Sequence, residues 1–239
     1  NNDGAGASAG HARVYELSGS TWVRMGADID GEAAGDQAGH SVAMNAVGDI
    51  VAVGAPYNDG LSGALSAADV GHVRIYQWNG TAWNQLGNEI IGEAAGDNSS
   101  GYSLGLNNSG SRIVIGAVNN DGTGSNAGQL RVFELSGSTW VQLGQDLDGE
   151  AAGNQLGYQV AINAEGDIVA GGAYLNAGGG SQRGHVRAYQ LSSTALSGMR
   201  WVQMGPDIDG GLATSDFFGS GLSLNAAGTR LAAGAYGSN

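Results

Sequence analysis

Carboxylates recur in a glycine-containing linker, and their spacing offers the clearest chemistry in the chain. The stretch DIDGE begins at Asp28, and its close relative DLDGE begins at Asp146. Several carboxylates on one glycine-rich loop are a ligand set that a hard cation such as Ca²⁺ selects. The candidate calcium ligands in the four linkers are Asp28, Asp30, Glu32, Asp36, Glu93, Asp97, Asp146, Asp148, Glu150, Asp207, Asp209 and Asp216.

The same carboxylates have a structural alternative that needs no metal. Arginines recur at one repeat position, namely Arg13, Arg74, Arg131 and Arg187. The linker glutamates could pair with these arginines across neighbouring units, or the linker acids could cap loop amides. Both interpretations stay open from the sequence. No cofactor is required by either, and calcium is the cofactor that the acidic linkers would take.

Residues typical of catalysis do not form a set. His11, His72 and His185 share one repeat position, so a repeat fold would place them on different units and not around one zinc ion. The stretch GYSLG, beginning at Gly101, satisfies G-x-S-x-G, but its counterparts in the other copies are not built around that serine, and no helix is expected after it. We expect no catalytic residue, and therefore no enzyme.

Tryptophans and asparagines provide candidate surface sites. One repeat position holds Trp22, Trp83, Trp140 and Trp201, which favours packing between units. Trp78 lies outside this pattern, beside a predicted hairpin turn, and is the candidate for a surface contact. The N-glycosylation sequons begin at Asn79, Asn98 and Asn107.

The elements that would position these residues come from an internal repeat. Four copies of one unit, about 60 residues apart, begin near Gly10, Gly71, Gly128 and Gly184. The second copy contains four runs of strand character, His72–Trp78, Trp83–Leu86, Tyr102–Leu106 and Arg112–Ala117, separated by Asn- and Gly-rich turns. No window has sustained helical periodicity. Four antiparallel strands repeated at this spacing are typical of a propeller blade.

The two ends of the sequence match one hairpin of the repeat. The strands His11–Leu17 and Trp22–Gly26 could complete a blade begun by Ser220–Leu224 and Arg230–Ala235. We therefore predict an all-β fold: a β-propeller of four four-stranded antiparallel blades, closed by pairing the N- and C-terminal strands. It would be a single domain over residues 1–239, with the last blade split between 219–239 and 1–30. The alternatives are half of a larger ring, or an array in which strands are exchanged between molecules.

Short stretches of the repeat resemble the FG-GAP repeat of integrin-α-type propellers. They are Phe218-Gly219, Gly39–Val42, Gly54–Pro56 and Gly71–Tyr76. The resemblance covers essentially the whole chain, although the terminal proline of the motif is kept in one copy only. It implies a propeller used in adhesion. The turn Asn45–Asp49 has too few carboxylates for that family's calcium loop, so the integrin-type calcium site is expected to be absent.

Composition excludes several classes of partner. The chain has 22 acidic and 9 basic residues, a formal charge of -13 and no cysteine. A surface of this sign repels nucleic acid and anionic bilayers. No apolar run is long enough to span a membrane, so membrane insertion is not expected. We expect an extracellular or cell-surface protein.

Together these patterns predict an extracellular structural or adhesive repeat module. It would make protein–protein or self-assembly contacts, with other copies of itself as a homopolymer among the partners. The alternative function is a glycan- or calcium-binding propeller of the lectin type, in which repeated loops would give several equivalent sites.

Overall fold

The structure is a computed structural model, and it describes residues 5–60, 69–93, 100–178, 181–193, 200–211 and 215–237. Every regular element in these ranges is a β-strand, as the sequence predicted. None of the described segments contains a helix that is long and apolar enough to cross a membrane.

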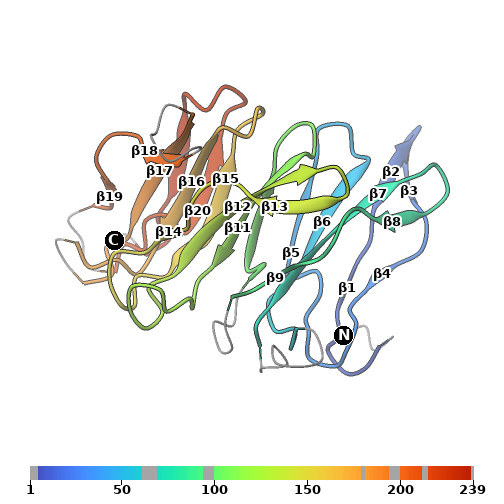
Figure 1. The fold of residues 1–239 in the computed structure, drawn as a ribbon, viewed down its shortest axis with the longest axis horizontal. Coiled ribbons are helices and arrows are strands. Elements are labelled where there is room, and N and C mark those ends of the chain that lie inside the picture. The colour runs from blue at the N-terminus through green and yellow to red at the C-terminus, as the bar shows by residue number, and fades with distance from the viewer. Residues whose placement is uncertain are drawn as a thin grey trace.

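Three successive antiparallel sheets form the body of the molecule (Figure 1). Sheet 1 consists of β5 (Ser41–Met44), β6 (Ile50–Ala55), β7 (His72–Trp78), β8 (Trp83–Gln85) and β9 (Ile90–Ile91). Sheet 2 consists of β10 (Ser103–Leu106), β11 (Arg112–Ala117), β12 (Gln129–Ser136), β13 (Thr139–Gln142) and β14 (Leu147–Asp148). Sheet 3 consists of β15 (Leu156–Ile162), β16 (Ile168–Ala173), β17 (His185–Ser192), β18 (Arg200–Gln203) and β19 (Ile208–Asp209).

Incomplete sheets lie on both sides of this body. The N-terminal half-sheet contains two strand pairs, β1 (His11–Ala12) with β4 (Ile29–Asp30) and β2 (Tyr15–Ser18) with β3 (Thr21–Arg24). The C-terminal half-sheet is the hairpin of β20 (Gly221–Leu224) and β21 (Leu231–Gly234). The strands that the repeat predicts are therefore present. The acidic linkers add a short strand to each unit (β4, β9, β14 and β19) that the sequence reasoning missed.

An asparagine at the tip closes each inner hairpin. The Oδ1 atom of Asn45 accepts hydrogen bonds from the backbone N–H groups of Gly48, Asp49 and Ile50 at 3.0, 3.1 and 3.0 Å. Gly48 has a positive φ of 84°, which glycine adopts without strain. Asn163 forms the same turn between β15 and β16. A local motif of the form N-x-x-G therefore fixes where each inner strand ends.

The hydrophobic core of the described residues consists of three clusters, each between two successive units. Ile29 and Val51 belong to the cluster between the N-terminal half-sheet and sheet 1. Ile75 and Ile113 belong to the cluster between sheets 1 and 2, and Leu130 and Val169 to the cluster between sheets 2 and 3. Because each sheet buries its apolar side chains against its neighbours, the stack is stabilised unit by unit.

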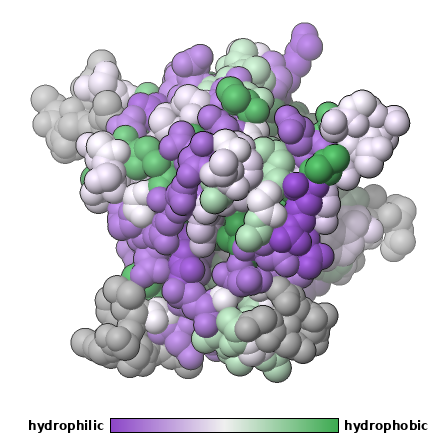
Figure 2. Space-filling model, turned by 90° about the vertical axis from the view of Figure 1, so that its right-hand side faces the viewer, coloured by the Kyte–Doolittle hydropathy of each residue, from purple (hydrophilic) through white to green (hydrophobic). Residues whose placement is uncertain are grey.

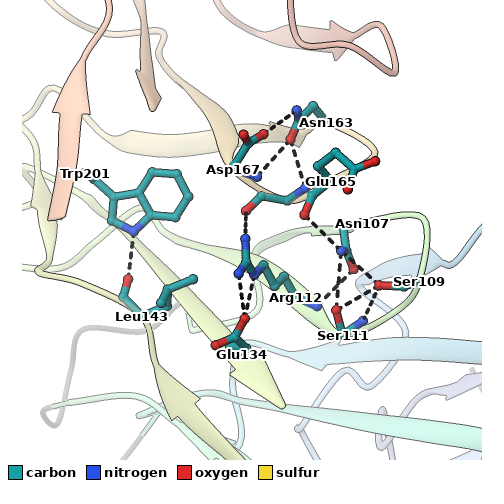
Figure 3. A network of polar contacts seen from close by, with 11 residues as sticks. Asn107, Ser109, Ser111, Arg112, Glu134, Leu143, Asn163, Glu165, Asp167 and Trp201 are labelled. Carbon is teal, nitrogen blue, oxygen red and sulfur yellow. Dashed lines mark hydrogen bonds and ion pairs between the residues drawn. The ribbon is translucent and has the colours of Figure 1, made fainter. Parts of the chain in front are cut away.

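The recurring tryptophans join one unit to the next. Trp83 Nε1 donates to the carbonyl oxygen of Met25 at 2.9 Å, and Trp140 Nε1 donates to that of Leu86 at 2.8 Å. Trp201 repeats the contact with Leu143 at 2.7 Å (Figure 3). The interpretation of these three as packing residues is confirmed.

The described strands do not close into a ring. β20 and β21 pair only with each other, and the N- and C-terminal ends lie on opposite sides of the stack (Figure 1). The physical reason is that successive sheets stack side by side. The rotation of each sheet relative to the one before it, summed over these units, leaves the two half-sheets apart. The structure thus confirms an all-β fold of antiparallel sheets, but the four-bladed closure predicted from the sequence is not observed.

Candidate functional site

The linker residues Glu32, Glu93 and Glu150 each form an ion pair with the recurring arginine of the next unit. Arg74 on β7 pairs with Glu32, which follows β4 of the preceding unit, and with Glu89 at 3.5 Å. Arg187 on β17 pairs in the same way with Glu150 of the preceding linker and, at 2.7 Å, with Asp207. In sheet 2, Arg131 lies 3.6 Å from Glu93. These ion pairs are the structural alternative that the sequence suggested.

A buried histidine lies beside two of these ion pairs. His72 Nδ1 is 3.9 Å from Glu32 and 3.7 Å from Glu89, and His185 Nδ1 is 4.0 Å from Glu150 and 3.7 Å from Asp207. Burial lowers the pKa of both imidazoles, and the nearby carboxylates offset this only in part. Both imidazoles are therefore predominantly neutral at pH 7.

The corresponding position in sheet 2 shows what the histidine does. Gln129 occupies it, and its Nε2 donates to Glu93 at 3.2 Å and to Asp148 at 3.1 Å. An amide replaces the imidazole here between carboxylates of two linkers. The groups Glu32/His72/Glu89 and Glu150/His185/Asp207 have the atoms to hold a metal ion. However, the arginines already neutralise these carboxylates, so the arrangement favours an interface contact over a metal centre.

The other candidate calcium ligands have separate structural roles. Asp36 is buried, and its Oδ2 accepts from the backbone of Glu32 and Ala33 and from Asn58 Nδ2 at 2.9–3.2 Å. Asp216 accepts from the Gly211 backbone at 2.6 Å.

The remaining acids follow the same pattern. Asp28 pairs with Arg13 at 2.8 Å and Asp146 accepts from Gln142 at 2.6 Å, whereas Asp209 lies exposed on β19. Asp30 lies on β4, and Asp97 falls outside the described residues. Calcium binding stays a prediction, and the carboxylates of one linker point to several different partners.

The sequons and Trp78 have different surroundings. Asn107 is only 3% exposed, and its side chain bonds to Ser109, Ser111 and the Arg112 backbone (Figure 3), so the folded chain leaves no room for a glycan there. Asn79 is exposed at its hairpin, so its glycosylation stays a prediction, and Asn98 falls outside the described residues. Trp78 is half-buried, with its ring 5.3 Å from that of Trp83.

Sequence reasoning missed a row of aromatic rings that crosses the sheets. We call these residues the aromatic row: His40, Tyr102, Tyr158, Tyr174, Phe217 and Tyr236. Successive ring centroids are 4.8, 5.6, 3.9, 6.1 and 5.0 Å apart. The first three members occupy one repeat position, which lies directly before β5 and β10 and within the first half of β15. That shared repeat position was the signal available in the sequence. It was interpreted as a variable position because histidine and serine also occur there.

A groove of about 330 Å³ lies over the first three rings of the row. Its lining consists of His40, Ser41, Val42, Tyr102, Ser103, Leu104, Tyr158 and Gln159. None of these side chains carries a fixed charge, and burial lowers the pKa of His40. Ser41 and Ser103 donate their hydroxyl protons to carbonyl oxygens of the next unit, at Gly101 and Gly157.

Two tyrosines of the aromatic row, Tyr102 and Tyr174, keep their phenolic protons at neutral pH. Burial, followed by the hydroxyls of Tyr158 and Tyr174, raises the pKa of Tyr102 to about 12. Burial also raises the pKa of Tyr174. These hydroxyls are therefore available both as hydrogen-bond donors and as acceptors at neutral pH. The groove combines aromatic surface with neutral polar groups.

Comparisons with known proteins give a likeness of fold only. No family model and no curated protein matches the chain. Among solved structures, a Bacteroides fragilis protein provisionally named 6-phosphogluconolactonase matches with a TM-score of 0.48 and 11% identity, over 74% of this chain and 40% of that one. A Bacteroides uniformis protein with the same provisional name matches with a TM-score of 0.49 and 9% identity, over 81% and 46%. The chain spans less than half the length of either.

These findings correct the predicted role. The expected adhesive module with FG-GAP and integrin-like character is corrected, because no family model matches the chain and the matched structures carry the name of a metabolic enzyme. The extracellular location is not tested by these findings and stays a prediction. The expectation that the chain is not an enzyme is likewise not confirmed by them. Adhesion was inferred from short glycine-containing stretches, and in the structure several of those glycines serve close contacts between sheets, as at Gly54 against Gly101.

Proposed function

We propose that this protein binds a small neutral polyol, of the size of a monosaccharide, in the groove over the aromatic row. The observation that carries the proposal is the lining of that groove. It presents tyrosine rings and hydroxyls, an amide and a neutral imidazole, with no fixed charge among its side chains. Aromatic surface combined with a few neutral hydrogen-bonding groups suits a ring compound with C–H faces and hydroxyl edges.

The chemistry of the two tyrosines supports this choice of ligand. Tyr102 and Tyr158 lie with ring centroids 5.6 Å apart, both half-buried. Since the raised pKa of Tyr102 keeps its hydroxyl protonated, it can donate to a ligand oxygen and accept from a ligand hydroxyl. Gln159 beside them adds one amide donor and one amide acceptor.

The charge of the whole chain argues against an anionic ligand. The formal charge is -13, and neither arginine nor lysine lines the groove. A sugar phosphate or sugar acid would enter a negative field without a cation to pair with. The lining contains no carboxylate to pair with the His40 imidazole, and the Ser41 and Ser103 hydroxyls donate to backbone carbonyl oxygens, so we propose binding without chemical change to the ligand.

Titration calorimetry with a panel of neutral monosaccharides and cyclitols tests this function. We expect Tyr158→Ala to abolish measurable binding, because it removes a ring and a hydroxyl from the groove. Tyr158→Phe keeps the ring and should weaken binding roughly fivefold, in line with the loss of one hydrogen bond of ~1 kcal/mol. Trp78→Ala is the matched control, since that aromatic residue lies at a hairpin outside the groove lining.

Two results would contradict the choice of ligand and reaction, and a third would contradict the choice of site. One is tighter binding of a sugar phosphate or aldonic acid than of any neutral sugar. The other is conversion of a sugar lactone to its acid, followed by NMR, at a rate that Tyr158→Ala reduces. Loss of binding in Trp78→Ala alone would place the ligand at the hairpin and also overturn the assignment to the aromatic row.

A further inference from the structure

Three kinds of contact repeat between successive units and then stop at both ends of the stack. A chain of backbone hydrogen bonds runs from turn to turn: Ala46 N to Asn108 O at 3.1 Å, Asn108 N to Ala164 O at 3.0 Å, and Ala164 N to Ala226 O at 3.0 Å. Tryptophan contacts and apolar clusters follow the same order. The internal interfaces therefore show what an end face would bind.

The N-terminal side exposes the half of an interface that is covered elsewhere. Trp22 is 65% exposed, whereas Trp140 and Trp201 at the same repeat position are 4% and 2% exposed. Val42 and Met44 on β5 are exposed as well. Figure 2 looks onto this side, where apolar side chains lie among hydrophilic ones.

The C-terminal side exposes the complementary half. The internal tryptophans donate to the backbone oxygens of Met25, Leu86 and Leu143, and the next residue in this series is Met204. Met204 is 40% exposed, whereas Leu143 is buried. Tyr236, at the end of the aromatic row, is also exposed. An exposed tryptophan at one end thus corresponds to an exposed acceptor position at the other.

Charge pairing identifies which strands would meet. In sheet 2, Arg112 and Glu134 are register partners on β11 and β12, and they form an ion pair of 2.7 Å (Figure 3). Sheets 1 and 3 have the uncharged pairs Ile50/Gln77 and Ile168/Gln190 at these positions.

The two half-sheets together contain the same charged pair as sheet 2, with the arginine on the C-terminal half-sheet and the glutamate on the N-terminal half-sheet. Arg230, directly before β21, corresponds to Arg112, and Glu16 on β2 corresponds to Glu134. Both are exposed, and within the described part of the chain neither belongs to an ion pair. An arginine on one half-sheet is thus matched by a glutamate on the other, as within sheet 2.

We propose that a second copy of this chain docks head to tail, so that β21 of one copy pairs with β2 of the next. The composite sheet has the order β20-β21-β2-β3, with Arg230 opposite Glu16 and Leu231 opposite Tyr15. This register is that of Ile113 with Phe133 in sheet 2. Trp22 Nε1 of one copy then donates to the Met204 carbonyl oxygen of the other. Pairing between copies follows because the two half-sheets of one chain lie on opposite sides of the stack.

Disulfide trapping tests the register directly, because the chain has no cysteine of its own. A mixture of the single variants Leu231→Cys and Tyr15→Cys should give a covalent heterodimer under mild oxidation. The double variant should give a ladder of multimers. The matched control combines Leu231→Cys with Leu17→Cys, two residues out of register, and should link much less. The pair Ala232→Cys with Val14→Cys checks the neighbouring position. The two cysteine pairs then sample both kinds of antiparallel residue pair, the hydrogen-bonded pair and the more closely spaced non-hydrogen-bonded pair.

Charge reversal tests the partner by a second route. Arg230→Glu and Glu16→Arg should each weaken association about fivefold, as expected for an exposed ion pair of up to ~1 kcal/mol. The chain that carries both substitutions should regain wild-type association, measured by sedimentation over a concentration range. Arg200→Glu, an exposed site outside the pair, controls for the change in net charge.

The possible outcomes distinguish head-to-tail docking from a closed ring and from a monomer. Intermolecular links in register and rescue by the double charge reversal support head-to-tail docking. Cross-linking within a single chain would show a closed ring and overturn it. A wild-type chain that sediments as a monomer at every concentration, with no links formed, overturns it as well. Ligand binding in the groove is measured independently, so either proposal can fail alone.

Discussion

At the scale of single residues, the tryptophan of the repeat shows how the place in the stack changes the role of a side chain. Trp140 is 4% exposed and donates to the Leu86 carbonyl oxygen at 2.8 Å. Trp22 has the same repeat position and neighbouring sequence, yet its ring is largely exposed because no described unit lies before it.

Substitution of these two tryptophans should therefore differ in effect. We expect Trp140→Ala to reduce the free energy of unfolding by about 3–5 kcal/mol, because it opens a cavity between sheets 1 and 2 and leaves a backbone acceptor unpaired. Trp22→Ala should change it by less than about 0.5 kcal/mol in the dilute monomer. Urea denaturation followed by circular dichroism measures both, and equal losses would contradict the interface assignment.

The buried histidines predict a dependence of stability on pH. Burial lowers the folded-state pKa of His185 below its ordinary value of 6.5, so the unfolded chain binds the proton more readily. The native state is therefore favoured fully above pH 6.5, and its stability falls as the pH drops below that value. The nearby Asp207 also has a lowered pKa and stays ionised over this range.

The variant that tests this is His185→Gln, which copies the natural Gln129 of sheet 2. We expect its urea midpoint to fall less than that of the wild type between pH 7.5 and pH 5.5. His11→Gln, at the same repeat position in the N-terminal half-sheet, is the matched control. An unchanged pH profile in His185→Gln would show that the buried imidazole does not govern the acid sensitivity.

At the scale of elements, the sheets approach each other most closely at glycines. Gly116 on β11 faces the backbone of Gly157 in the next unit, where any side chain would collide with the carbonyl oxygen. Gly54 on β6 faces Gly101 in the same manner. Gly221 on β20, by contrast, has no atom near the position of an added Cβ. Glycine content thus reflects sheet contact as well as turns.

This contrast predicts the effect of adding one methyl group. Gly116→Ala should destabilise the fold by about 1–3 kcal/mol through overpacking, because backbone and not a flexible side chain is in the way. Gly221→Ala should be nearly neutral. Thermal unfolding of the two variants measures the difference, and a stable Gly116→Ala protein would show that sheets 2 and 3 are not held at this spacing.

Sequence patterns predicted most of the strands and turns, but they did not predict all of the contacts between units. The repeat placed the strands, and the N-x-x-G motif placed turns such as Asn163–Gly166, because both depend on local chemistry. The aromatic row could not be recognised, since it joins Tyr102 to Tyr158 across two sheets and needs the distance between units. The ion pairing of the acidic linkers depends on the same distance, which brings Glu32 of one unit to Arg74 of the next.

At the scale of the whole molecule, the described strands form three complete sheets with an incomplete one on each side. Its two end faces carry matched exposed groups, and its formal charge of -13 opposes anionic ligands. The adhesive role expected from short motifs is replaced by a proposal that depends on the groove over the inner strands. Calcium binding and an extracellular location stay predictions.

Binding of a neutral polyol to the aromatic row can be observed by following the tyrosine ring resonances by NMR while a neutral monosaccharide is titrated into the protein. We expect saturable shifts of the Tyr102 and Tyr158 rings, assigned by their phenylalanine variants, with little change at the indole of Trp78. Shifts confined to Trp78, or saturation only with a sugar phosphate, would contradict the proposal that the aromatic row binds a neutral polyol.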